Sequence, residues 1–148
     1  KNDMKKINLV YGTVNGEAEF VTREVAEQFA ADGVDHRLVE CDELAGWGPP
    51  EDEILLVICS STGYGDLPDE IYPWFLELQE SAYLPNLEYG LIGLGDSSYE
   101  IFNGAIVQFE ELFAGFGASA LKPTLKLDAA INYAPEKDAK EWLSSIIS

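Results

Sequence analysis

Three short segments of the chain combine glycine with hydroxyl, amide and carboxylate side chains. They read GTVNGEA at residues 12–18, SSTGYGDLPD at residues 60–69 and GLGDSSYEIFN at residues 93–103. Small polar residues with exposed backbone N–H groups suit an anion or a polar ligand, and a tyrosine among them suits a flat ring. The three segments contain no histidine, lysine or arginine. They therefore offer a binding site rather than a nucleophile–base pair.

The first segment joins a predicted strand to a predicted helix. Free N–H groups and the positive end of the helix dipole form an anion site at such a junction. Thr13 and Asn15 can donate from their side chains, and Gly16 allows close approach of the backbone. The spacing matches neither a Walker loop nor G-x-G-x-x-G, so a terminal monophosphate suits it better than a triphosphate. The alternative is that Thr13 or Asn15 only caps the helix.

The second and third segments each place a tyrosine among small residues. Gly63 and Gly65 flank Tyr64, which predicts a flexible turn with exposed N–H groups. The alternative for this segment is an ordinary strand-to-helix turn that Asp69 caps. In the third segment Tyr99 follows a buried strand, where it either packs as a half-buried side chain or forms one wall for a flat ring.

The composition is that of one globular domain, which we place at residues 1–148. We expect Met4 to be the natural first residue, with residues 1–3 added before it. No apolar run of about 18 residues predicts a membrane span, and no signal peptide is visible. Cys41 and Cys59 are expected to be reduced thiols of a cytoplasmic protein. One histidine and two distant cysteines predict no metal site.

The charge is strongly acidic, with 27 acidic against nine basic residues and a formal net charge of −18. Sixteen acidic residues and no lysine or arginine lie between Arg37 and Lys122. Such a surface disfavours nucleic acid and anionic membranes as partners. It favours a basic protein partner that is steered by long-range attraction. The alternative is that the acidic residues confer only solubility or salt tolerance.

Apolar patterning predicts alternating strands and helices. The expected strands are 7–11, 34–40, 54–60, 87–95 and 124–127. The expected helices are 16–31, 69–81, 103–116 and 135–147, the first with Phe20, Val21, Val25, Phe29 and Ala30 on its inner side. This alternation indicates an α/β fold with a parallel sheet between helices. Ligands then bind at the carboxyl ends of strands one, three and four, whereas His36 lies away from them and is structural or exposed.

The segments GTVNGEAEFV, SSTGYGDLPDEI and GLGDSSYEIFNGA resemble the three FMN-binding loops of flavodoxins and of the FMN modules of diflavin reductases. The resemblance runs from about Ile7 to the C-terminus. TLKLDAAINYAPEKDAKEWL is similar to the end of the short-chain, MioC-like and YqcA-like flavodoxins, and no insertion interrupts the fifth strand. The resemblance implies a flavodoxin-like three-layer α/β/α sandwich whose five-stranded parallel sheet has the order 2-1-3-4-5.

The resemblance also implies FMN as the cofactor and a role for each matching position. The phosphate would be wrapped by Thr13, Val14, Asn15, Gly16, Glu17 and Ala18, mostly through backbone N–H groups. Ser60 would reach the phosphate or the ribityl chain. One side of the isoalloxazine ring would be lined by Ser61, Thr62, Gly63, Tyr64 and Gly65. The other side would be lined by Gly95, Asp96, Ser97, Ser98 and Tyr99, with Tyr99 stacked on the ring and Phe102 and Asn103 close by.

The chain departs from the family pattern at two places. Thr62 stands where many relatives carry an aromatic residue, so either Tyr64 shields that face of the ring or the face is open. Glu17 and Ala18 stand where hydroxyl residues are common. A carboxylate beside a dianionic phosphate is unfavourable unless it points to water.

The resemblance implies a monomeric, low-potential electron carrier without catalytic residues. Such a protein shuttles single electrons between a flavodoxin- or ferredoxin-type reductase and acceptor enzymes with basic surfaces. The acidic stretch would lower the potential of the second reduction, because negative charge disfavours an anionic reduced flavin. The alternative is an NAD(P)H-dependent quinone or azo reductase, which needs extra loops or a dimer to build a substrate pocket. A phosphorylation receiver is excluded, since Ser60 and Ser61 stand where it needs an aspartate.

Overall fold

The computed structural model describes residues 4–131 and 133–147, apart from the side chain of Ser81. The expectation about residues 1–3 lies outside these residues. The strands are β1 (Ile7–Gly12), β2 (His36–Val39), β3 (Ile54–Ser60), β4 (Glu88–Gly95), β5 (Ser119–Ala120) and β6 (Leu125–Asp128). All pair in parallel in the order β2-β1-β3-β4, and both β5 and β6 lie along the outer edge of β4. The predicted flavodoxin-like order is confirmed.

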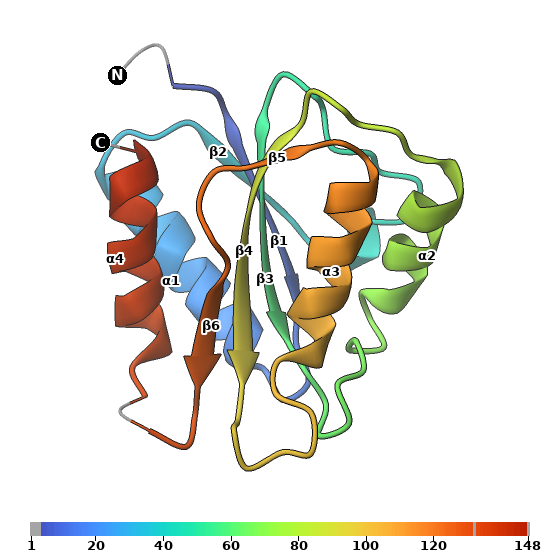
Figure 1. Ribbon diagram of the computed structural model, residues 1–148. Coiled ribbons are helices and arrows are strands. Elements are labelled where there is room, and N and C mark those ends of the chain that lie inside the picture. Colours follow the sequence, from blue (N-terminus) through green and yellow to red (C-terminus); the bar gives the residue numbers. More distant parts are fainter. Residues whose placement is uncertain (1–3, 132, 148) are drawn as a thin grey trace.

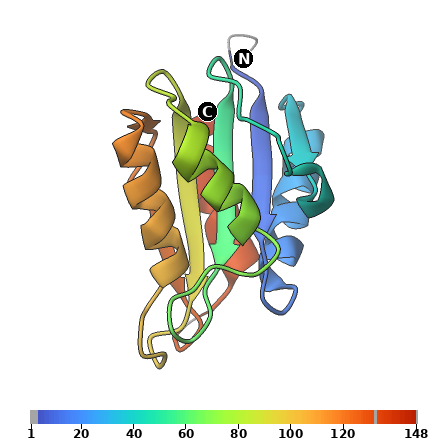
Figure 2. The same cartoon turned by 90° about the vertical axis from the view of Figure 1, so that its right-hand side faces the viewer.

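Two pairs of helices cover the sheet. The helices are α1 (Glu17–Ala31), α2 (Tyr72–Ser81), α3 (Gly104–Gly115) and α4 (Pro135–Ile147), with a short 3₁₀-helix η1 (Cys41–Glu43) after β2. In Figure 1, α1 and α4 lie on one face and α2 and α3 on the other, and Figure 2 shows the same layers after a quarter turn. β3 is buried along its whole length because both faces are covered, which explains its nearly continuous apolar run.

The fifth position of the sheet is divided between two short strands, which the sequence did not indicate. Tyr89 of β4 pairs with Ala120, and Ile92 pairs with Leu125. Three steps along β4 therefore match five steps along the neighbouring chain. The two extra residues fall in a segment that contains Pro123, which has no N–H group to donate to the ladder. No longer insertion separates the two strands.

Two helices differ from their predicted form. α2 begins at Tyr72 rather than at Asp69, with Pro73 in its first turn, where the fixed φ and missing N–H of proline are tolerated. On α1, Phe20 is 51% exposed, and Ala30 is also exposed, so both predictions of an inner position were wrong. The buried face of α1 instead passes through Ala18, Val21, Thr22, Val25 and Phe29. The spacing of these buried residues follows the helical repeat more closely than the spacing of the five apolar residues that the sequence suggested.

Close packing at the start of α3 fixes the loop that precedes it. Asn103 has a left-handed backbone conformation with φ of 55°, and its side chain is fully buried against β4. Its Nδ2 donates to the carbonyl of Leu127 at 3.1 Å. A Cβ added at Gly93 would lie 2.5 Å from Asn103 Oδ1 and 2.6 Å from Ile106 Cγ2. β4 therefore needs glycine where the helix crosses it.

We predict that Gly93→Ala destabilises the fold by about 1–3 kcal/mol, the usual cost of overpacking a filled core. The matched control is Gly115→Ala at the end of α3, where an added Cβ meets nothing within 4 Å. That change should stabilise by about 0.5–1 kcal/mol, because alanine suits a helix better than glycine. Urea unfolding of both variants measures the difference, and equal effects would contradict the packing described here.

Candidate cofactor site

The three loops that the sequence singled out meet at the carboxyl edge of the sheet, the lower end of Figure 1. A cavity of about 230 Å³ opens between them. Its lining includes eight of the predicted residues, which are Val14, Asn15, Glu17, Ser60, Ser61, Gly95, Asp96 and Tyr99. Leu94 and Ala129 complete the lining, to which no lysine or arginine of the described residues contributes. The parallel sheet thus brings together segments 12–18, 60–69 and 93–103, which are far apart in the sequence.

The first loop presents backbone N–H groups at the start of α1. Thr13 Oγ1 accepts the N–H of Gly16 at 2.8 Å, and Asn15 Oδ1 accepts the N–H of Glu17 at 3.4 Å. The N-cap of α1 is nevertheless Gly16, which makes no side-chain capping bond, so neither Thr13 nor Asn15 is the N-cap and these two contacts shape the loop before the helix. Within residues 4–131 and 133–147, no hydrogen bond uses the N–H groups of Val14, Asn15 or Ala18. These three donors remain for an anion.

Both carboxylates that line the cavity already have donors within the protein. Glu17 Oε1 accepts the hydroxyl proton of Tyr133 at 2.8 Å. Asp96 Oδ1 accepts the N–H and the hydroxyl of Ser98 at 2.8 and 2.6 Å. Burial, followed by this contact with Glu17, raises the pKa of Tyr133, so its hydroxyl keeps its proton. The Glu17 carboxylate therefore has a hydrogen-bond donor within the protein, Tyr133, in addition to any water.

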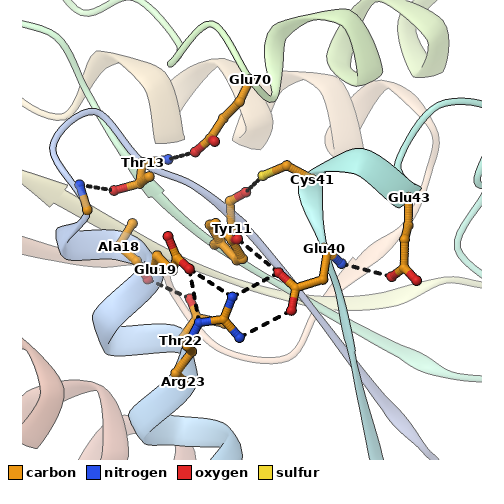
Figure 3. Close-up of polar contacts among 11 residues, drawn as sticks. Tyr11, Thr13, Ala18, Glu19, Thr22, Arg23, Glu40, Cys41, Glu43 and Glu70 are labelled. Carbon is orange, nitrogen blue, oxygen red and sulfur yellow. Dashed lines mark hydrogen bonds and ion pairs between the residues drawn. The ribbon is translucent and has the colours of Figure 1, made fainter.

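Arg23, the basic residue of α1, is held away from the first loop by ion pairs with two acidic residues. Figure 3 shows the Arg23 guanidinium between Glu19 and Glu40, with ion-pair distances of 2.8 and 2.9 Å. It lies over the ring of Tyr11, whose hydroxyl also donates to Glu40 at 3.0 Å. Arg23 keeps the pKa of the Glu40 carboxyl below its ordinary value, so the pair stays charged. An anion at the first loop therefore meets neutral donors.

Glu70 ties the first loop to the segment that follows β3. Its Oε2 accepts the N–H of Thr13 at 2.7 Å, as Figure 3 also shows. Thr13 and Val14 line a second hollow of about 300 Å³ with Thr62, Pro68, Asp69 and Glu70. Nearby, burial and then Glu70 raise the pKa of the Cys41 thiol to about 12, so this free cysteine is not a reactive thiolate.

The second loop is a tight turn between Thr62 and Asp66. Thr62 Oγ1 accepts the N–H of Asp66 at 3.0 Å, and the Thr62 carbonyl accepts the N–H of Gly65 at 3.0 Å. Gly65 has φ of 85° and lies against Ile101, so this position requires glycine. Tyr64 at the tip is 71% exposed. It does not line either hollow.

The ring of Tyr99 lies against the second loop. A Cβ added at Gly63 would lie 4.0 Å from two atoms of that ring. A flat ring inserted between Gly63 and Tyr99 would need about 3.5–4.0 Å of separation on each side. With the third loop in the conformation described here, the predicted arrangement of a ring between the second and third loops therefore requires the second loop to move.

The remaining predicted residues do not line the 230 Å³ cavity. They are Thr13, Gly16, Ala18, Thr62, Gly63, Tyr64, Gly65, Ser97, Ser98, Phe102 and Asn103. Asn103 is buried beneath the third loop, where its Oδ1 has no partner among the described residues. Gly16 and Ala18 belong to the helix start, and Phe102 is partly exposed.

The sequence analysis missed Glu70, Asp128 and Tyr133. Asp128 accepts the N–H of Ser97 at 2.8 Å, so it touches the third loop directly. One signal was available, since Asp128 ends the strand beside β4 and therefore lies at the same edge. Glu70 and Tyr133 stand in loops without a periodic pattern, and nothing in the local sequence predicts their contacts.

The family model for flavodoxin matches residues 9–142. The chain belongs to the flavodoxin family. It is 38% identical over 141 residues to Flavodoxin YqcA of Escherichia coli K12, with 95% of each chain covered. It is 34% identical over 146 residues to Protein MioC of the same strain, with 98% of each covered. A solved flavodoxin from Pseudomonas aeruginosa, a mutant in which alanine replaces one cysteine, shares 36% identity over 95% of each chain, with a TM-score of 0.83.

Membership of this family confirms the recognised resemblance and gives the chain an electron-transfer function. It also implies a flavin cofactor, as in flavodoxins generally. The related flavodoxins are electron carriers. Across residues 4–131 and 133–147, every helix is too short or too polar to span a bilayer.

We predict that Glu17→Gln strengthens FMN binding about two- to fivefold, the effect of one nearby charge at a helix start. Riboflavin has no phosphate, so its affinity should not change. Tyr133→Phe should weaken FMN binding because the Glu17 carboxylate loses the donor that holds it. Fluorescence titration of each variant with both ligands measures these effects, and an equal change for riboflavin would rule out the phosphate as the cause.

Proposed function

We propose that this flavodoxin binds FMN at the 230 Å³ cavity and carries single electrons between a reductase and acceptor enzymes, without being a catalyst by itself. The bound flavin supplies the electron transfer, while the protein binds and orients it. The observation that carries the proposal is the presence of free N–H donors, polar lining residues and Tyr99 at one edge of the sheet.

The donor set suits the phosphate end of FMN. The N–H groups of Val14, Asn15 and Ala18 lie at the positive end of α1, where a phosphate is favoured without a cation. The carboxylates of Glu17 and Asp96 are both hydrogen-bonded to protein donors, which lowers their competition for these groups. We therefore assign the phosphate to the first loop.

The remaining cavity suits the sugar-alcohol chain and one face of the ring. Ser60 lines the cavity and is only 6% exposed, so its hydroxyl is available to a bound polyol rather than to bulk water. Tyr99 is the aromatic side chain of the lining. Stacking on it would hold a flat ring at the open side of the cavity.

The charge distribution favours basic redox proteins as partners. The third loop carries Asp96 and Glu100, and the second carries Asp66 and Asp69. Among residues 4–131 and 133–147, five cations form ion pairs with acids, and these are Lys5, Arg23, Arg37, Lys126 and Lys140. The ligand edge is thus negative, which also lowers the potential at which an anionic reduced flavin forms. We propose in addition a single-domain, monomeric and cytoplasmic protein.

Addition of FMN to the purified, FMN-free protein tests the proposed function. We expect saturable binding in calorimetry with one FMN per chain and quenching of flavin fluorescence. The FMN-loaded protein should not oxidise NADPH in stopped-flow measurements unless a reductase is added. Absence of FMN binding would overturn the cofactor assignment, and rapid direct NADPH oxidation would favour the quinone or azo reductase.

We predict that electron transfer from a basic reductase slows as salt is added. At physiological ionic strength, salt screens the attraction between exposed charges that lie more than about 8 Å apart. The association rate should therefore fall steeply between low and high salt. The measurement is the second-order rate constant as a function of sodium chloride concentration. A rate constant that is indifferent to salt would contradict steering by the acidic surface.

A further inference from the structure

The third loop is fastened to the neighbouring strand by a side chain to which neither the family pattern nor the sequence analysis gave a role. Asp128 ends β6 and pairs in register with Gly95, the last residue of β4. Its Oδ1 accepts the N–H of Ser97 at 2.8 Å and the N–H of Ala130 at 2.9 Å. The N–H of Ala129 donates to the carbonyl of Gly95 at 2.8 Å. Asp128 therefore joins the ends of two parallel strands.

These contacts hold the turn that leads to Tyr99, while two residues further on the N–H of Ile101 donates to the carbonyl of Gly63 at 3.4 Å. Residues 96–99 form a turn in which the N–H of Tyr99 donates to the carbonyl of Asp96 at 3.0 Å. The N–H of Ser98 donates to the Asp96 carboxylate, so that part of the turn is held from within. The N–H of Ser97, by contrast, points out of the turn to Asp128. Asp128 is thus the external anchor of the turn that carries the aromatic ring.

We propose that Asp128 is a positioning residue that holds the third loop in the conformation that presents Tyr99 to the flavin. The inference rests on the proposed function, because the place of Tyr99 matters for electron transfer only if a flavin binds there. The role of Asp128 is to accept hydrogen bonds rather than to touch the cofactor, since it does not line the cavity.

The direction of the change in FMN affinity distinguishes a positioning role of Asp128 from a direct effect of its charge. Hydrogen bonds from the N–H of Ser97 and then of Ala130 hold the pKa of its carboxyl below the ordinary value, so it is ionised at neutral pH. A negative charge opposes the binding of an anion such as FMN. If Asp128 acted on the cofactor through its charge alone, removal of that charge would strengthen binding. If Asp128 is a positioning residue, a variant that cannot accept these hydrogen bonds should instead bind FMN more weakly.

Four variants distinguish these possibilities. Asp128→Ala removes the acceptor, whereas Asp128→Asn keeps an acceptor oxygen and removes the charge. Ser97→Pro removes the N–H of the other partner together with the Ser97 hydroxyl, which also contacts Asp128, and proline is favoured at the second position of such a turn. Asp52→Ala is the control, because Asp52 is an exposed acid on the turn before β3, at the opposite end of the sheet.

The readouts are the FMN dissociation constant and, in the FMN-free protein, amide hydrogen exchange at Ser97. We expect Asp128→Ala to weaken FMN binding about tenfold and to speed exchange at Ser97 by about as much, as loss of a hydrogen bond to a charged group predicts. For Asp128→Asn, the FMN dissociation constant and the exchange rate at Ser97 should both remain within about threefold of the wild-type values. Ser97→Pro should weaken binding like Asp128→Ala, and the double variant should lose little more.

The outcomes separate the two proposals. If the wild type binds no FMN, the proposed function fails, while the exchange data still report whether Asp128 anchors the loop. If the wild type binds FMN but Asp128→Ala and Ser97→Pro bind equally well, the positioning role is overturned. Tighter binding by both Asp128 variants would assign a charge effect instead. If Asp128→Ala does not fold, Ser97→Pro alone decides the question.

Discussion

Parallel pairing of β1, β3, β4 and β6 is the constraint on which the rest of this molecule depends. It sends every strand toward the same edge, so the chain must turn there into a helix four times. Each turn leaves backbone donors and acceptors that secondary structure does not use. The 230 Å³ cavity, the hydrogen bond from the N–H of Gly16 to Thr13 and the contact between Ser97 and Asp128 all involve these groups.

Acidity adds a second requirement at the same edge. A protein with a net charge of −18 that binds a phosphate ester must keep its own carboxylates away from the phosphate donors. Here two of the nearby acids accept hydrogen bonds from other parts of the protein, and a third, Glu70, occupies one N–H of the first loop. Glu17 contacts Tyr133, Glu70 accepts from Thr13, and Asp96 accepts from Ser98. In the proposed mode of binding, the neutral N–H groups of the first loop would hold the phosphate and the surrounding charge would attract a basic partner.

The fold was predictable because its signals are local and repeated. The run ILLVICS is typical of a strand that is covered on both faces, and the loops that follow β1, β3 and β4 carry small polar residues. The contacts that shape the site are long-range. Tyr133 reaches Glu17 across 116 residues, and the place of Phe20 depends on which turn of α1 meets the sheet. The local sequence contains neither kind of information.

The most direct measurement follows the backbone amide resonances of the FMN-free protein during addition of FMN. Anchoring of the phosphate by neutral donors at the start of α1 predicts that the largest downfield shifts occur at Val14, Asn15 and Ala18. Added inorganic phosphate should move the same resonances in the same direction. Shifts confined to residues near Lys122 and Lys126, with the first loop unchanged, would show that cations hold the phosphate and would contradict this mode of binding.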